Sequence, residues 1–405
     1  MPTLRQRLEG LSAARPTLRP AAAARANQEG AGFSLSESCY PLTARECLVR
    51  LPLADPQPLA LLLPDSQRVI PPIHDWLFLD LETTGLAGGT GTYAFLVGLG
   101  RLTGDGFHLR QFFLRDLAAE KVMLAEMLPL LCGAQALVTY NGKQFDAPLL
   151  ETRFQLARLV RPEVELHLDL LYPARRLWRH RWDSLRLVDL ERNLLGFHRS
   201  DDIPGELIPS TYFDFLRRGD EARLSLVFRH NADDLLTLAA VTAHALQLLT
   251  VPELATPEEL FGVARIFERA RHLDRARVLY ERALAAGLPS TLAPAASYRL
   301  SLLCKRQRDY SRAVALWQQL LESGEKKEES GTLAVCEELA ICYEHRLDDA
   351  ETAAELTRRA LALLGQDGRH TTNGLGNFEG IRARLSRRLA RLTRKQSQES
   401  ATALF

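Results

Sequence analysis

The pattern of apolar residues changes once along this chain, close to Pro257. Before this point, apolar runs typical of strands alternate with segments of helical period, whereas beyond it the apolar spacing is helical. A chain with both patterns in succession does not form one all-β or one all-helical domain. We therefore expect an α/β domain followed by an all-α domain, in keeping with the two or three domains usual for 405 residues.

The first part of the pattern predicts a mixed sheet flanked by helices. Strand-like segments lie at 76–82, 95–102, 107–114 and 136–141, and helical segments at 118–132 and 146–160. Several strands in succession, followed by alternating strand and helix, are typical of a mixed sheet. We assign this domain to residues 73–250. Residues 1–72 read as a partly disordered leader and a short extended segment with one or two strands.

The second part carries an internal repeat. Alanines recur every 37 residues, and two aromatic residues keep the same interval: Ala276, Ala313, Ala350, and Tyr280, Trp317. This interval is close to the ~34 residues of a tetratricopeptide unit, a helical hairpin that buries its apolar face by stacking on its neighbour. We expect such repeats over 257–365, with a concave face suited to a partner protein. Residues 366–405 read as a linker, a basic helix that caps the last repeat, and a tail.

Composition excludes several classes of protein. The 51 Lys and Arg residues are balanced by 50 Asp and Glu residues, so any nucleic-acid site must be local. No apolar run approaches the ~20 residues that span a bilayer, which excludes a membrane protein. The six cysteines form no CxxC pair, so we expect neither a disulfide scaffold nor a zinc site of the usual spacing. They favour a reducing, cytoplasmic location.

The strand-like segment FLDLETTG (78–85) carries two carboxylates. Alternate residues of a strand share a face, so Asp80 and Glu82 point the same way and the neighbouring leucines point the other way. Two adjacent carboxylates repel each other, and a hard divalent cation such as Mg²⁺ relieves that repulsion. The alternative interpretation is that one carboxylate lies at a solvated strand end.

Two further segments supply acidic residues. In VTYNGKQFDAPLL (138–150), a short strand ends at Asn141 and Asp146 opens a helix, where it alternatively serves only as a helix cap. In RHNADDLL (229–236), His230 and Asp234 are four apart and so share one helix face. The alternative is a charged helix start, in which Asp233 and Asp234 complement the helix dipole.

Taken together, the three segments are more specific than any one of them. A strand, a helix start and a second helix would supply four carboxylates and a histidine: Asp80, Glu82, Asp146, Asp234 and His230. That set suits two divalent cations about 3.5–4 Å apart, one activating water and one stabilising the leaving oxygen of a phosphodiester. The pattern predicts phosphodiester hydrolysis.

These motifs resemble those of a known superfamily. DLETTG, then N-x4-D, then H-x3-D look like the three exonuclease motifs of the DEDD superfamily of 3′–5′ exonucleases, which have a ribonuclease H-like fold. The segments 85–100, 167–179, 187–196 and 201–209 further resemble the YprB-like branch, whose members often carry a tetratricopeptide-like C-terminal region. The resemblance covers about 76–249.

The resemblance implies roles for the acidic residues. Asp80, Glu82, Asp146 and Asp234 would bind two Mg²⁺ or Mn²⁺ ions, and His230 would orient or deprotonate the attacking water. The histidine stands four positions before the final aspartate, the spacing of the tyrosine-type enzymes, so its role as general base stays open. The implied substrate is the 3′ end of single-stranded DNA or RNA.

Three groups of residues are candidates for substrate binding. Thr83 and Thr84 precede the glycine-rich stretch GLAGGTG, which is otherwise only a flexible turn. Arg175 and Arg179 lie in ARRLWRHRW (174–182), where arginines would hold phosphates and tryptophans would stack on bases, unless this is a solvated face with tryptophan in the core. Asn141 is the third candidate.

We therefore expect a metal-dependent 3′–5′ exonuclease. Two alternatives stay open: a non-catalytic adaptor that binds nucleic acid and recruits a partner through its repeats, and a structure-specific endonuclease, because the same two-metal chemistry occurs on the same fold. The presence of all four carboxylates favours an active enzyme. The sequence leaves both DNA and RNA open as substrates.

Overall fold

A computed structural model describes most of the chain, namely residues 32–45, 48, 51–52, 54–85, 89–252, 255–322, 329–367 and 378–402. Its contacts divide the chain between Leu254 and Ala255 into two compact units. The expected leader before residue 32 and the expected linker at 368–377 lie outside the described residues.

The first unit contains a six-stranded sheet. Its strands are β1 (Phe33–Tyr40), β2 (Trp76–Thr83), β3 (Ala94–Leu102), β4 (Phe107–Leu114), β5 (Ala136–Thr139) and β6 (Leu166–Asp169). The strand order is β1-β4-β3-β2-β5-β6. The pairs β1–β4, β4–β3 and β3–β2 are antiparallel, whereas β2–β5 and β5–β6 are parallel. The predicted mixed sheet is confirmed.

The sheet extends beyond residues 73–250, because β1 pairs with β4 at its edge. The apolar residues at 57–62, which the sequence also suggested as a strand, are not in a strand. It forms the 3-10 helix η3 (Gln57–Leu62), which starts after Pro56 and has Pro58 in its first turn. Proline has no backbone N–H for a ladder, so these residues resist pairing in a sheet despite being apolar.

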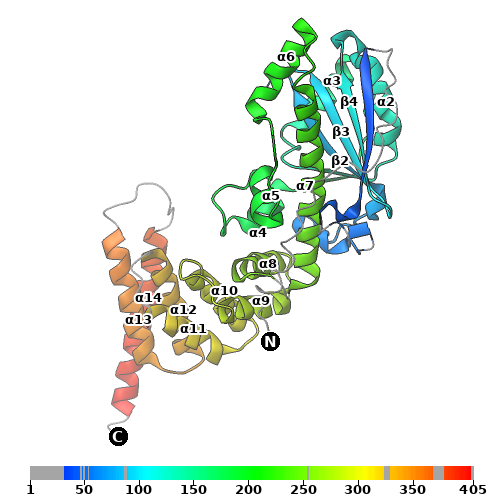
Figure 1. Cartoon of the computed structure of the whole chain (residues 1–405). Coiled ribbons are helices and arrows are strands. Elements are labelled where there is room, and N and C mark those ends of the chain that lie inside the picture. Colours follow the sequence, from blue (N-terminus) through cyan, green and yellow to red (C-terminus); the bar gives the residue numbers. More distant parts are fainter. Residues whose placement is uncertain are drawn as a thin grey trace. The chain divides into compact units, whose positions relative to one another are not determined.

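Helices cover both faces of the sheet (Figure 1). They are α2 (Glu120–Cys132), α3 (Asp146–Leu156), α4 (Leu171–Trp178), α5 (Leu187–Leu195), α6 (Ile208–Arg218) and α7 (Leu224–Thr250). Further 3-10 helices are η1 (Leu42–Ala44), η4 (Ile73–Asp75), η5 (Leu117–Ala119) and η6 (Gly205–Leu207). The buried leucines of β2 point away from α7, and Asp80 and Glu82 point toward it.

Helix α7 is longer than its acidic segment suggested. It begins at Leu224, so His230, Asp233 and Asp234 lie in its interior rather than in its first turn. The alternative interpretation, a charged helix start that complements the dipole, is therefore wrong, because the dipole effect is confined to the terminal turn.

The second unit is helical in the residues that the structure describes. It contains α8 (Pro257–Arg269), α9 (Leu273–Ala285), α10 (Ala293–Arg306), α11 (Tyr310–Glu322), α12 (Glu329–His345), α13 (Ala350–Asp367) and α14 (Phe378–Thr402). Each helix packs on its neighbours in sequence. The repeated alanines, Tyr280 and Trp317 are buried, and Leu385 and Leu392 of the basic helix α14 are buried too. Among the described helices, none has both the length and the apolarity needed to span a bilayer.

Candidate active site

Strand β2 places Asp80 and Glu82 in a largely buried position facing α7. Asp80 Oδ2 accepts a hydrogen bond of 2.7 Å from Asn231 Nδ2, and Asn231 Oδ1 accepts one of 2.9 Å from Gln111 Nε2. Asn231 is completely buried. Position 98 of β3 must be glycine here, because a Cβ atom would overlap the Asn231 side chain. The backbone of β3 thus makes room for the amide that orients Asp80.

Four carboxylates influence one another at this site. Burial raises the pKa of Asp80 well above its ordinary value, and the charges of Asp234, Glu82 and Asp146 raise it further. Burial also raises the pKa of Glu82, with additional contributions from Asp234 and Asp146. The sequence placed these four residues in three separate segments, and the structure brings them together.

Asp146 stands at the start of α3, beside β2. Burial raises its pKa to about 7, with the charges of Asp169 and Asp234 adding to the effect. Hydrogen bonds with the backbone of Asp146 and Leu81 lower this pKa and so offset part of the rise. Asp146 is thus more than a helix cap, since it takes part in the electrostatic cluster. No three of the residues Asp80, Glu82, Asp146 and Asp234 have carboxylate oxygens that all lie within 4.8 Å of one another.

Adjacent aspartates of α7 point in different directions. Asp234 Oδ1 lies 2.5 Å from Arg199 Nη2, on the side of the other carboxylates. Asp233 Oδ1 instead lies 3.3 Å from Arg45 Nη2, which also contacts Glu191 Oε1 at 3.1 Å. Successive residues of a helix are rotated by about 100°, which explains the separation. Asp234 is therefore the aspartate of this pair that lies with the other carboxylates.

Arg199 was not anticipated from the sequence. Its side chain is only 4% exposed and bridges Glu191 Oε2, at 2.6 Å, and Asp234 Oδ1. Its charge opposes the rise in the pKa of Glu82, while the carboxylates raise the pKa of Arg199 itself. Arg199 therefore neutralises part of the acidic cluster. It lies in a loop without periodicity, so no sequence signal pointed to it.

His230 is held by an acidic residue whose role the sequence did not indicate. His230 Nδ1 lies 2.8 Å from Asp202 Oδ1, and His230 Nε2 lies 3.5 Å from Asp234 Oδ2. A carboxylate at Nδ1 fixes the orientation of the ring and favours the tautomer with its proton on that nitrogen. Nε2 is then the nitrogen that faces the acidic cluster. Asp202 thus positions the imidazole ring of His230.

A cavity of about 770 Å³ opens beside the carboxylates. Its lining includes Asp80 and Asp234 together with three residues that the sequence suggested for substrate binding: Asn141, Arg175 and Arg179. Asn141 has a positive φ of 64°, its backbone N–H bonds to Asp169, and its buried Oδ1 accepts no hydrogen bond from the described residues. An acceptor in this position suits a ligand with a hydroxyl or amino group.

The remaining substrate-binding candidates have structural contacts. Thr83 Oγ1 donates to Gly85 O at 2.9 Å, and Thr84 Oγ1 accepts from Tyr93 N at 2.9 Å. These bonds secure the ends of the glycine-rich turn. The arginine-rich segment is divided: Arg175 and Arg179 line the cavity, while Trp178 is buried. The buried ring is not available to stack on a base.

The topology and the acidic cluster define a class of protein. Residues 77–246 match the model of the RNase_H superfamily, and the chain belongs to this superfamily. The match spans β2 to α7 and includes all four carboxylates. A curated relative is "Uncharacterized protein YprB" of Bacillus subtilis (strain 168), which is 33% identical over 297 residues, or 71% of this chain and 70% of the relative.

Proposed function

We propose that this chain is a metal-dependent 3′–5′ exonuclease. The observation that carries the proposal is the electrostatic coupling of four largely buried carboxylates beside a cavity lined by arginines. Burying like charges together is costly without cations, and such cost is common at catalytic sites. The RNase H superfamily, in which nuclease activity is usual, supports the same conclusion.

The donor set fits Mg²⁺ or Mn²⁺. Asp80, Glu82, Asp146 and Asp234 offer only oxygen ligands, which these hard cations prefer. Two bound ions would supply an activated water and stabilise the charge that develops on the leaving oxygen.

The protein's own residues have distinct tasks in this proposal. Asn231 orients Asp80, and Asp202 orients His230 so that Nε2 faces the cluster. His230 Nε2 accepts the proton of the attacking water, a transfer for which an imidazole is suited near neutral pH. Arg175 and Arg179 hold phosphates of the substrate along the cavity.

The size of the cavity supports a single-stranded substrate. Its volume of about 770 Å³ lies within the range of ~300–1,000 Å³ typical of sites for small ligands. A site of this size suits one or two unpaired nucleotides better than a duplex. We therefore favour a single-stranded substrate over a duplex.

A time course on labelled strands tests the proposal. Single-stranded DNA and RNA of one sequence, labelled at the 5′ end, are incubated with Mg²⁺, Mn²⁺ or EDTA and with wild type or Asp80→Asn. We expect a metal-dependent ladder that shortens from the 3′ end and is absent with the variant. Internal cuts would indicate an endonuclease. Intact strands that stay bound would favour the adaptor.

Charge reversal tests the role of the cavity arginines. We expect Arg175→Glu/Arg179→Glu to weaken binding of a single-stranded oligonucleotide at least tenfold at low salt, and to reduce the slope of log K against log salt by about 1.4, or ~0.7 per phosphate contact. The matched control, Arg217→Glu/Arg218→Glu, changes two exposed arginines of α6. Equal weakening by both variants would contradict a local role for the cavity.

We also propose that the helical unit is a tetratricopeptide-like scaffold for a partner protein. The buried alanines at the 37-residue interval and the packing of successive helices support this proposal. A cytoplasmic location is our further proposal, supported by the free thiols of Cys39, Cys132, Cys304, Cys336 and Cys342.

A further inference from the structure

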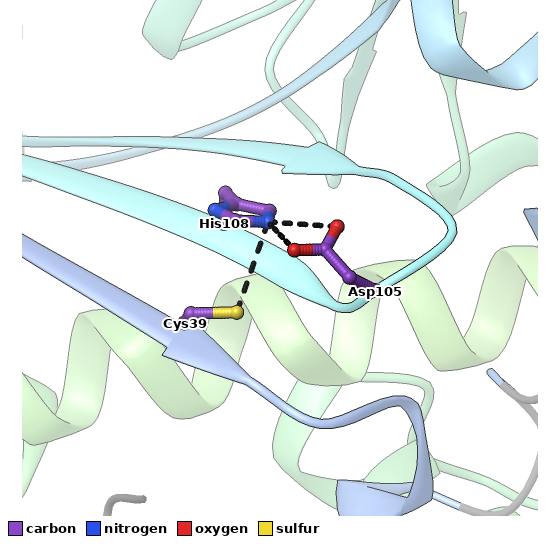
Figure 2. Close-up of side chains that lie close together, drawn as sticks. All are labelled: Cys39, Asp105 and His108. Carbon is purple, nitrogen blue, oxygen red and sulfur yellow. Dashed lines mark hydrogen bonds and ion pairs between the residues drawn. The ribbon is translucent and has the colours of Figure 1, made fainter. Parts of the chain in front are cut away.

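A second group of metal-ligating side chains lies away from the acidic cluster. Figure 2 shows Cys39 from β1, Asp105 from the turn between β3 and β4, and His108 from β4 pointing toward one another. His108 Nε2 lies 3.7 Å from Cys39 Sγ and 3.2 Å from Asp105 Oδ1. One ligand atom from each residue lies within 4.8 Å of the other two. Among the described residues, this is the one such group.

The fold brings these three residues together specifically. Cys39 and His108 are direct partners in the antiparallel pairing of β1 with β4, so their side chains share a face. Thr103 Oγ1 donates to Asp105 Oδ1 at 2.5 Å and holds that carboxylate. Gly106 allows the turn to approach β1, because a Cβ there would lie 2.7 Å from Tyr40 O and 2.8 Å from Cys39 Sγ.

Two of the three separations match those around a tetrahedral metal ion. With Zn–S near 2.3 Å and Zn–N or Zn–O near 2.0–2.1 Å, tetrahedral angles place sulfur and nitrogen about 3.6 Å apart, and nitrogen and oxygen about 3.3 Å apart. In the structure, His108 Nε2 lies 3.7 Å from Cys39 Sγ and 3.2–3.3 Å from the two carboxylate oxygens of Asp105. The positions of Cys39 Sγ and of the Asp105 carboxylate relative to His108 Nε2 therefore suit ligands of one ion.

This group is distinct from the carboxylate cluster. Cys39 and His108 line a cavity of about 760 Å³, together with Leu77 of β2 and Leu130 of α2. Leu77 and Asp80 are three apart in β2 and so point to opposite faces of the sheet. The cavity gives an ion and water access to the group from solvent.

We propose that Cys39, Asp105 and His108 bind one zinc ion. A thiolate and an imidazole select zinc or a similar transition metal over Mg²⁺, whose preferred ligands are oxygens. Three protein ligands leave a fourth position for water. Because Cys39 belongs to the edge strand β1, the ion links that strand to the β3–β4 hairpin. The site is independent of the proposed nuclease activity.

Cobalt substitution tests this assignment directly. Full-length metal-free protein without an affinity tag is titrated with Co²⁺, and the thiolate-to-cobalt absorption in the near ultraviolet is recorded before and after addition of Zn²⁺. We expect one equivalent to produce the band in wild type and Zn²⁺, but not millimolar Mg²⁺, to remove it. Cys39→Ser should abolish the band, and His108→Ala should weaken Co²⁺ affinity at least tenfold.

Three matched variants separate this site from others. Cys132→Ser removes an exposed cysteine, and His74→Ala removes an exposed histidine that lies 3.6 Å from Asp75, so both should keep the band. Asp80→Asn should keep it as well. A band that survives Cys39→Ser, or that disappears with Cys132→Ser, would overturn the proposal.

Thermal unfolding gives a second readout. Zinc at about 100 times its Kd should raise the Tm of wild type by roughly 5 °C, because the ion binds the folded state only. We expect no such rise for Cys39→Ser. A similar rise in both proteins would show that the ion stabilises the fold elsewhere.

Discussion

Replacing Asp234 by asparagine is expected to lower the rate of nucleotide release by ~10³-fold or more. Asp234 contributes to the raised pKa values of Asp80, Glu82 and Asp146, so it stands among them electrostatically. A metal ion typically provides several kcal/mol of transition-state stabilisation, and loss of about 4 kcal/mol corresponds to ~10³ in rate. Single-turnover cleavage of a labelled strand with saturating Mg²⁺ measures this loss.

Asp233→Asn is the matched control for this variant. The same change is made one residue away on the same helix, but the Asp233 carboxylate contacts Arg45 rather than the acidic cluster. Arg45 keeps its second partner, Glu191, in this variant. We expect the rate to stay within about fivefold of wild type. Equal losses in the two variants would mean that the helix, and not a metal ligand, is responsible.

The second large effect is on stability. We expect Asp146→Asn to raise the Tm of the metal-free protein by roughly 5 °C near pH 8. Folding raises the pKa of Asp146 from 3.8 to about 7. A raised carboxyl pKa stabilises the folded state fully below about pH 3.8, and this contribution is lost as the pH rises through about 7. Asparagine has no charge to bury, so the advantage of the variant should grow over this range.

Thermal unfolding in EDTA from pH 4 to 8 measures this difference. Millimolar Mg²⁺ at pH 8 should raise the Tm of wild type but not that of Asp146→Asn. The control, Asp189→Asn, should show the opposite sign, because the hydrogen bond from Ser184 lowers the pKa of Asp189. A constant difference between wild type and Asp146→Asn at all pH values would rule out burial of the charge as the cause.

Much of the fold could be predicted because the deciding signals are local. The predicted strands coincide closely with β2, β3, β4 and β5, whose apolar runs are buried in the sheet. The predicted helices at 118–132 and 146–160 correspond to α2 and α3. The position of β1 at the edge of the sheet was not predicted, since its pairing with β4 depends on a distant segment that local periodicity does not describe.

The candidate site was predicted only in part for a similar reason. Alternation along β2 correctly put Asp80 and Glu82 on one face, because that follows from strand geometry alone. Asn231, Arg199 and Asp202 became visible only through their contacts with Asp80, Asp234 and His230. The catalytic roles of all these residues stay predictions until the variants are measured.

By itself, the sequence determined the order of strands and helices, the mixed sheet and the acidic residues available for chemistry. Backbone periodicity and residue type suffice for these properties, since each acts over a few neighbouring residues. Only the tertiary structure decided that Arg199 neutralises part of the cluster, that Asp233 contacts Arg45 instead, and that Cys39 meets Asp105 and His108. Electrostatic and coordination partners depend on distance in space, and packing of remote segments sets that distance.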